Sequence, residues 1–423
     1  MSTALAARPA PGLLPRFRGL RHTTPGRFQL IVAVLIVLGL AAALATGLTG
    51  RATAAGTGDL GDRAQPLLVQ AEAIYSGLAD ADTTAAQAFL AGGLEPAALT
   101  QRYNTDLDQA TGALAEAARL APEGSRAAGA VRAIAAALPR YTALVATARA
   151  DNRQGLAVSS SYLAAAADLN RTALLPEAQT LFRIAQSEVS DGYRDAASTG
   201  WVTVLVLALL ALLAALLLAQ RHLSRTTHRT FNLPLVAATA LTLLLGLGAA
   251  LVLVRQGTHL GRAEDTGSAP AAQLAEARIL ALRERGDEAL TLAARGGEDK
   301  NEQDFQAASR DLTTALDNGY LADQAKQAHA SYLALHKQVR ELDNGGNYDD
   351  AVKLAVGTET GTAFTTLTGD LGTALDQRKA AFTDEIGAAG RGLGLLTVLG
   401  PLAALAIAAL AAAGVRARLE EYR

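Results

Sequence analysis

The sequence predicts an all-α membrane protein with four transmembrane helices and two extracytoplasmic antiparallel four-helix bundles. Four apolar runs of about 19 to 22 residues contain no charge, and each is long enough to cross a hydrocarbon core of roughly 30 Å as a helix. The segments between them are rich in Ala, Leu, Gln, Glu and Arg, poor in Pro, and lack β-branched alternation, which favours helix. The runs cover 30–48, 201–219, 233–254 and 393–414.

The spacing of the runs predicts the order of domains. Long polar segments follow the first and third runs, whereas only a short segment joins the second to the third. We therefore expect a basic cytoplasmic tail over 1–28, spans over 29–48, 200–220, 233–254 and 392–414, helical bundles outside the membrane over 49–199 and 255–391, a cytoplasmic loop over 221–232 and a cytoplasmic tail over 415–423.

Basic residues determine the expected orientation, because those that flank membrane spans stay in the cytoplasm. The tails and the short loop carry a net charge of +9, whereas the two long segments carry −4 and −7. The arginines concerned are Arg8, Arg16, Arg18, Arg21, Arg27, Arg221, Arg225, Arg229, Arg416, Arg418 and Arg423, beside the acidic Glu420 and Glu421. We expect a multi-pass protein of the cell membrane with both termini cytoplasmic. The acidic exterior excludes nucleic acid, and the basic patches suit anionic membrane lipids.

The first apolar run is an uncleaved anchor or a signal peptide. Residues 52–54 offer a small-x-small cleavage pattern, but the run before them is longer than a typical signal core, which favours the anchor. The chain has no cysteine, so an exterior domain must be stabilised by its own core rather than by disulfides.

The first long segment predicts four amphipathic helices. Apolar residues step by three and four from Leu67 to Leu90 and stop at 92–93, where two glycines follow. The next helices cover about 96–122, 131–155 and 163–201, and the last continues into the second span. Four such helices with short turns predict an antiparallel bundle.

The second long segment repeats this plan. Its helices are expected at 274–292, 305–318, 320–343 and 348–386. Tyr141 and Arg149 have counterparts in Tyr332 and Arg340, and Gly155 has one in Gly346 at the same offset, while the glycines at 92–93 correspond roughly to those at 296–297. These correspondences favour a tandem duplication of a span–bundle–span unit, although convergent helix composition explains them too.

A search for chemistry finds no catalytic, cofactor or metal motif, so we expect no enzyme and no cofactor. Thiolate chemistry is excluded, and no Walker loop, dinucleotide fingerprint or Gly-x-Ser-x-Gly elbow is present. His329 and His336 share a helix face but lack a third ligand, so a position on the bundle surface is favoured over a metal site.

Two kinds of charged cluster remain as candidates. Two acidic pairs, Asp80 with Asp82 and Asp287 with Glu288, could bind a cationic partner or simply lie on a solvated helix face, and the solvated face is favoured. Arginines near helix ends suit a carboxylate ligand or cap helix carbonyls. The candidate ligand- or partner-binding residues are Arg149, Asn152, Arg153, Arg340 and Asp343.

The spans carry no Asp, Glu, Lys or Arg at their centres, which argues against a transporter. Their many small residues suit a packed four-span core or a homodimer. The alanine-rich composition of the chain explains these residues equally well.

The chain resembles known membrane receptors in its layout. Four-helix bundles anchored outside the membrane are similar to the input domains of chemoreceptors and sensor kinases. The duplicated form resembles the GlnX-type membrane components of actinobacterial nutrient sensing over about residues 28 to 415. The segments that carry the resemblance are 74–82 (IYSGLADAD), 91–96 (AGGLEP), 152–155 (NRQG) and 286–292 (GDEALTL).

This resemblance implies a non-enzymatic signalling adaptor. Its partners would be an exterior amino-acid-binding lipoprotein and a cytosolic Ser/Thr protein kinase. The alternative is a structural membrane scaffold for envelope or division proteins, which would tether its partners without switching.

Overall fold

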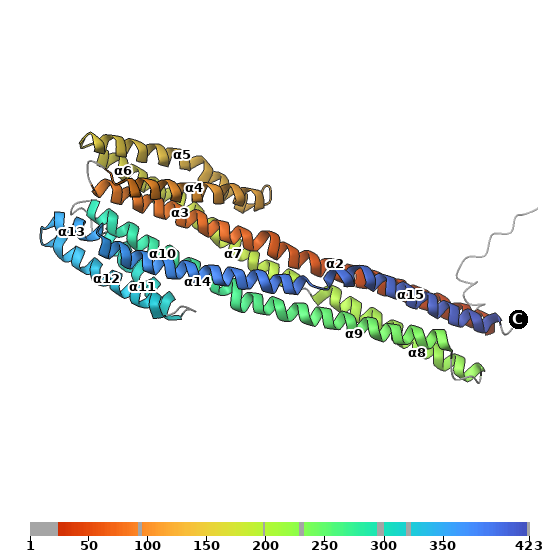
Figure 1. Ribbon diagram of the computed structural model, residues 1–423. Coiled ribbons are helices and arrows are strands. Elements are labelled where there is room, and N and C mark those ends of the chain that lie inside the picture. The colour runs from red at the N-terminus through yellow and green to blue at the C-terminus, as the bar shows by residue number, and fades with distance from the viewer. Residues whose placement is uncertain are drawn as a thin grey trace, which may run out of the picture. The chain divides into compact units, whose positions relative to one another are not determined.

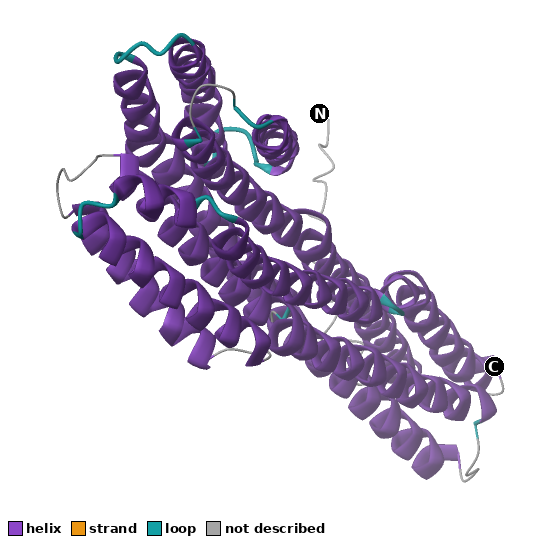
Figure 2. Ribbon diagram, turned by 60° about the vertical axis from the view of Figure 1, so that its left-hand side comes forward, coloured by secondary structure: helices purple, strands orange, loops and turns teal. Residues whose placement is uncertain are grey.

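The computed structural model describes residues 24–91, 95–197, 199–227, 232–293, 300–318 and 323–420. Every regular element in these ranges is a helix, and none is a strand (Figure 2). The chain divides into two compact units, one made from 1–56, 195–258 and 389–423, and the other from 57–194 and 259–388. The expected helical fold is confirmed for the described residues.

The first unit is built from four apolar helices that contain the predicted spans. They are α2 (Thr24–Asp59), α8 (Thr199–Thr227), α9 (Leu233–Arg262) and α15 (Leu393–Glu420) (Figure 1). All are long and apolar enough to cross a membrane, which fits a multi-pass membrane protein. The arginine pattern that predicts their orientation remains a prediction.

Large apolar side chains point outward from this unit. Leu44, Leu247 and Leu251 are 68 %, 69 % and 70 % exposed. Soluble proteins rarely expose contiguous apolar surface of this kind, whereas a bilayer solvates it. Inside the unit, Leu212 and Leu235 are buried in a core shared by all four helices.

Small residues bring α2 and α15 close together. A Cβ added to Gly39 would lie 2.5 Å from the Cβ of Ala408, and one added to Gly400 would lie 2.2 Å from the Cγ2 of Thr46. Glycine at these positions therefore permits a contact between backbones that a larger residue would block. The expected homodimer remains a prediction.

The second unit contains both long segments. The first contributes the π-helical turn η1 (Leu60–Ala64), α3 (Gln65–Leu90), α4 (Ala97–Leu120), α5 (Arg126–Arg153), α6 (Ser159–Leu169), the π-helical turn η2 (Asn170–Leu174) and α7 (Leu175–Ala196). The helices lie where the apolar periodicity predicts them, because their leucines and isoleucines form the core. Gly155 follows α5 with φ +69°, a conformation that glycine adopts readily at the end of a helix.

The second segment contributes η3 (Ala263–Ser268), α10 (Ala269–Ala293), α11 (Lys300–Asn318), α12 (Asp323–Asn344), α13 (Tyr348–Ala355) and α14 (Thr358–Gly390). The single helix expected over 348–386 is wrong, because the chain breaks between α13 and α14. A Cβ on Gly357 would lie 2.8 Å from the carbonyl oxygen of Lys353. The Thr360 hydroxyl donates to the carbonyl oxygen of Leu354 at 2.8 Å, which satisfies a carbonyl at the end of α13.

Some expected features lie outside the described residues. These are most of the basic N-terminal tail, the glycine pairs at 92–93 and 296–297, Ser198 between α7 and α8, part of the short loop, residue 320 and the last three residues.

Candidate functional site

The two segments of the second unit meet along α3 and α10, which pack against each other. Glu72 on α3 is buried at this contact. Its Oε1 lies 3.2 Å from Nη1 of Arg278 on α10, and its Oε2 lies 3.8 Å from Nζ of Lys379 on α14. These ion pairs join residues about 200 positions or more apart, so they tie the two segments into one unit.

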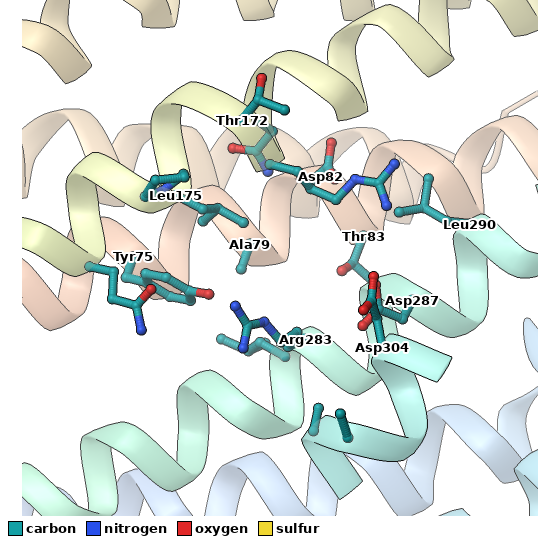
Figure 3. A pocket seen from close by; sticks show the side chains of 18 of the residues that line it. Tyr75, Ala79, Asp82, Thr83, Thr172, Leu175, Arg283, Asp287, Leu290 and Asp304 are labelled. Carbon is teal, nitrogen blue, oxygen red and sulfur yellow. The ribbon is translucent and has the colours of Figure 1, made fainter. Parts of the chain in front are cut away.

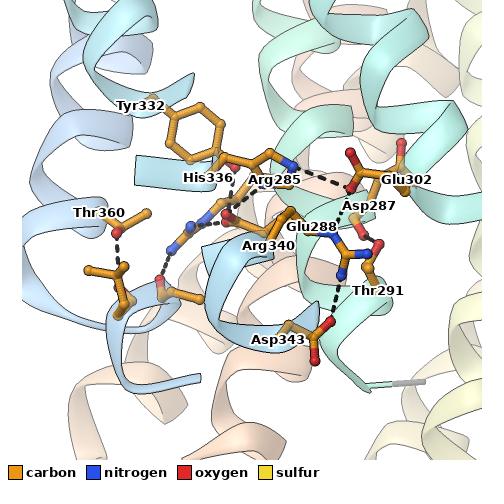
Figure 4. A network of polar contacts seen from close by, with 12 residues as sticks. Arg285, Asp287, Glu288, Thr291, Glu302, Tyr332, His336, Arg340, Asp343 and Thr360 are labelled. Carbon is orange, nitrogen blue, oxygen red and sulfur yellow. Dashed lines mark hydrogen bonds and ion pairs between the residues drawn. The ribbon is translucent and has the colours of Figure 1, made fainter. Parts of the chain in front are cut away.

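A buried polar network extends from this contact into the second segment (Figure 4). Glu288 on α10 is at its centre and is 2 % exposed. It forms an ion pair with Arg285, accepts a hydrogen bond from the Tyr332 hydroxyl at 3.0 Å, and lies 3.0 Å from Nδ1 of His336. Glu302 on α11 is the second acidic neighbour of His336, at 3.4 Å from Nε2.

Arg285 connects several helices through this network. Its Nη2 donates to the carbonyl oxygen of Ala355 at the end of α13, at 2.8 Å. Its guanidinium lies over the rings of Tyr332 and Phe364, 5.8 and 5.6 Å from their centroids. Nε of Arg285 donates to the side-chain oxygen of Gln87 on α3 at 3.0 Å, in the amide orientation that satisfies both groups. One buried cation therefore links α3, α10, α12, α13 and α14.

The network alters the pKa values of its members. Burial opposes ionisation of Glu288, but Arg285, His336 and Tyr332 outweigh burial and hold the pKa of this carboxyl below its ordinary value. Burial also lowers the pKa of His336, but Glu288 and Glu302 outweigh it, so that this pKa is raised above 6.5. The network therefore favours a charged His336 between two carboxylates.

The first segment contains a simpler version of the same arrangement. Tyr141 on α5, like Tyr332 on α12, is fully buried, and its hydroxyl donates to a buried carboxylate, that of Asp82 on α3, at 3.3 Å. No arginine corresponding to Arg285 pairs with Asp82 among the described residues. Burial therefore dominates and raises the pKa of Asp82 to about 6, against hydrogen bonds from Asn170 and Tyr141.

A cavity of about 400 Å³ lies between the two segments (Figure 3). Its walls come from α3, the η2 region, α10 and α11. Its charged lining residues are Asp82, Asp168, Asp287, Asp304, Asp311, Arg171, Arg283 and Lys300. A volume of this size is typical of sites for small molecules. No group of His, Asp or Glu in the described part of the chain has the arrangement of a metal site.

The predicted ligand-binding arginines lie away from this cavity. Arg149 pairs with Glu95 at 2.7 Å and donates to the Thr100 hydroxyl at 3.1 Å, and its guanidinium lies over the Tyr103 ring. Asn152 donates to the carbonyl oxygen of Phe89 at 3.4 Å.

The corresponding corner of the second segment has the same construction. Arg340 lies 3.2 Å from Glu302 and donates to Asp343 and Asn344. Arg153 is exposed at the end of α5. Arg149, Asn152, Arg340 and Asp343 thus have partners within the chain, and binding of an external ligand by these residues remains a prediction.

Two expectations about buried groups are wrong. Asp82, Asp287 and Glu288 were expected on solvated faces, and His329 and His336 on the bundle surface, but all five are buried. For Glu288 the spacing carried a signal, because positions 281, 285, 288 and 292 step by four, three and four along α10 and therefore share its buried face. Side-chain polarity predicts exposure for these residues, since a charge is rarely buried without a partner.

Comparison with known proteins adds one observation. Residues 56–194 match the family model described as Actinobacterial sensor domain. The match covers the first segment of the second unit and supports an actinobacterial sensor protein. No curated protein and no solved structure matched the chain.

Proposed function

We propose that the chain is a non-enzymatic transmembrane sensor that acts as a signalling adaptor. The observation that carries this proposal is the sensor-domain match over 56–194, which coincides with one segment of a compact helical unit in a chain with four candidate spans. The arginine asymmetry supports an exterior position for this unit and a cytoplasmic position for both termini.

A tandem duplication explains the construction of the helical unit. Both segments begin with a π-helical turn, η1 or η3, and both place a buried tyrosine against a buried carboxylate. Arg149 pairs with Glu95, which lies just before α4, and Arg340 pairs with Glu302 near the start of α11. Gly155 and Gly346 both have positive φ after the third helix. Four independent correspondences of this kind favour duplication over chance similarity of helices.

Long helical runs offer a route for the signal. Helical structure continues without interruption over Gly26–Leu90 and over Leu233–Leu292, and each run contains one apolar span and one of the two central helices, α3 or α10. A shift between α3 and α10 would pass along both runs as a small displacement or rotation, which is how packed helices commonly switch.

The expected partners follow from the resemblance in the sequence. A solute-binding lipoprotein outside would deliver the signal, and a cytosolic Ser/Thr protein kinase would receive it. The experiment is a crosslinking pull-down from native membranes, with a photo-reactive residue at the exposed Lys337 and, in a matched control, at the apolar Leu251. Recovery of a solute-binding protein at Lys337 alone is expected, because this lysine lies on the exterior unit. Recovery of cell-wall enzymes alone would replace the sensor with a scaffold.

Mechanical coupling has its own test. Seven glycines inserted after Thr258 should uncouple the helical unit from any cytoplasmic readout, because a flexible segment absorbs displacement. Seven alanines at the same place add about two helical turns and keep the phase of the helix, so they should preserve the signal. Equal signalling by both insertions would contradict coupling through α9 and α10.

A further inference from the structure

The cavity between α3 and α10 has an uneven distribution of charge. Five aspartates and three basic residues line it. Arg283 lies beside Tyr75 at one end, while Asp287 and Asp304 lie together at the other, near Thr83 (Figure 3). Two acidic groups thus lie together at this end, and Arg171 and Arg283 are the basic groups that act on Asp287.

Two buried oxygen atoms at this end have no partner. Oδ2 of Asp287 and Oγ1 of Thr83 form no hydrogen bond with any described residue. Asp287 is 5 % exposed and Thr83 is 6 % exposed, so little solvent reaches their side chains. Buried polar atoms are nearly always hydrogen-bonded, because an unsatisfied one costs about 1 to 3 kcal/mol. Their position in the wall of a cavity shows where a donor from a ligand would fit.

We propose that this cavity binds a small organic cation through a primary ammonium group, with Asp287 as its counter-ion and Thr83 as a hydrogen-bond acceptor. An ammonium group has three N–H donors and no acceptor, which matches two unpartnered oxygens and the neighbouring Asp304. Two more acidic than basic residues line the cavity, so a ligand with net positive charge balances it. This inference rests on the proposed function, because it places the stimulus of the sensor between its two central helices.

The same site gives the binding a pH dependence. Burial and then the neighbouring Asp304 raise the pKa of Asp287 to about 7, against Arg171 and Arg283. An ammonium ligand favours the ionised carboxylate, so affinity should rise with pH up to about 7 and level off above it. The charged groups facing Asp287 are Asp304 and Lys300 from α11, Arg171 from η2, Arg283 and Glu284 from α10, and Asp82 from α3.

The test is calorimetric titration of the purified full chain in detergent with putrescine and with ethanolamine. Both should bind saturably, and Asp287→Asn should weaken binding by about tenfold to a hundredfold, since a charged hydrogen bond contributes about 1.5 to 3 kcal/mol. Thr83→Val should weaken it by about threefold to tenfold. Asp376→Asn is the matched control, because this aspartate is 80 % exposed and lies outside the cavity. It should bind like the wild type.

Tetramethylammonium and glutamine distinguish the chemistry of the ligand. Tetramethylammonium carries the charge without N–H donors, and glutamine carries a primary ammonium without net charge, so both should bind more weakly than putrescine. The proposal is overturned if putrescine or ethanolamine does not bind, or if Asp287→Asn binds them as tightly as the wild type does. It is also overturned if tetramethylammonium binds as tightly as putrescine. Tighter binding of glutamine than of putrescine would overturn the assignment to a net cation.

The design keeps two failures separate. Asp287→Asn is expected to fold, because it removes a buried charge that has no ion pair among the described residues. If it does not fold, Thr83→Val and the wild-type pH profile decide the matter. Binding is measured without partners, so putrescine binding with a failed pull-down refutes only the adaptor. A successful pull-down without amine binding refutes only the ligand site.

Discussion

Removal of Arg285 should destabilise the helical unit more than any surface change. This guanidinium is 4 % exposed and pairs with Glu288, which is 2 % exposed. Arg285→Met keeps the aliphatic volume but leaves Glu288 buried without its cation and the Ala355 carbonyl without its donor. Breaking a buried pair in this way costs about 3 to 5 kcal/mol.

The expected magnitude lies at the lower end of this range, because Glu288 keeps its contacts with Tyr332 and His336. A loss of about 3 kcal/mol lowers the melting temperature of a domain of this size by about 6 to 12 °C. The assay is thermal unfolding of the purified full chain followed by circular dichroism at neutral pH. Lys337→Met is the control, since this lysine is 79 % exposed and should change stability by less than about 0.5 kcal/mol.

A double-mutant cycle tests the reasoning itself. Glu288→Gln alone leaves Arg285 buried without a counter-charge, so it should also destabilise the unit. The combination of Arg285→Met with Glu288→Gln removes both charges and should be more stable than either single variant. If Arg285→Met melts like the wild type, or if the double variant shows the summed loss of the two singles, the buried pair does not stabilise this unit.

Three further predictions concern pH, packing and orientation. Because the pKa of His336 is raised in the folded protein, its charged form stabilises the fold fully below pH 6.5, and this stabilisation is lost as pH rises through the raised pKa. The melting temperatures of wild type and His336→Gln should therefore converge with rising pH. A constant difference would contradict a charged imidazole. Gly400→Val should disturb the contact of α15 with α2 and lower the yield of folded protein from membranes. Gly394→Val should not, because a side chain added there contacts no neighbouring atom. Equal yields of the two variants would argue against close packing. Cysteines at Ser125 and Asn344 should label with an impermeant maleimide in intact cells and one at Thr226 should not, and the opposite pattern would reverse the proposed orientation.

The sequence alone was sufficient for features that depend on neighbouring residues. Uninterrupted apolar runs predict helices that suit a hydrocarbon environment, and all four runs lie in such helices. Periodic leucines predict the helices of the second unit, because the pattern requires only a local choice of backbone and one buried face. The break at Gly357 was missed, since glycine occurs many times inside helices of this chain without ending them.

The tertiary structure decided which charges are buried and what they contact. Glu72 and Asp82 are buried with partners from other helices, and the partner of Glu72, Arg278, is more than 200 positions away. Glu288 pairs with Arg285 on its own helix and with Tyr332 and His336 from α12. The cavity likewise combines α3 with α10 and α11, which no local pattern relates. A charge is stable in a protein interior only when a partner neutralises it, or when its pKa shifts so that it becomes neutral. The position of that partner is a property of the folded chain, and for this reason hydropathy and spacing predicted the helices but not the site between them.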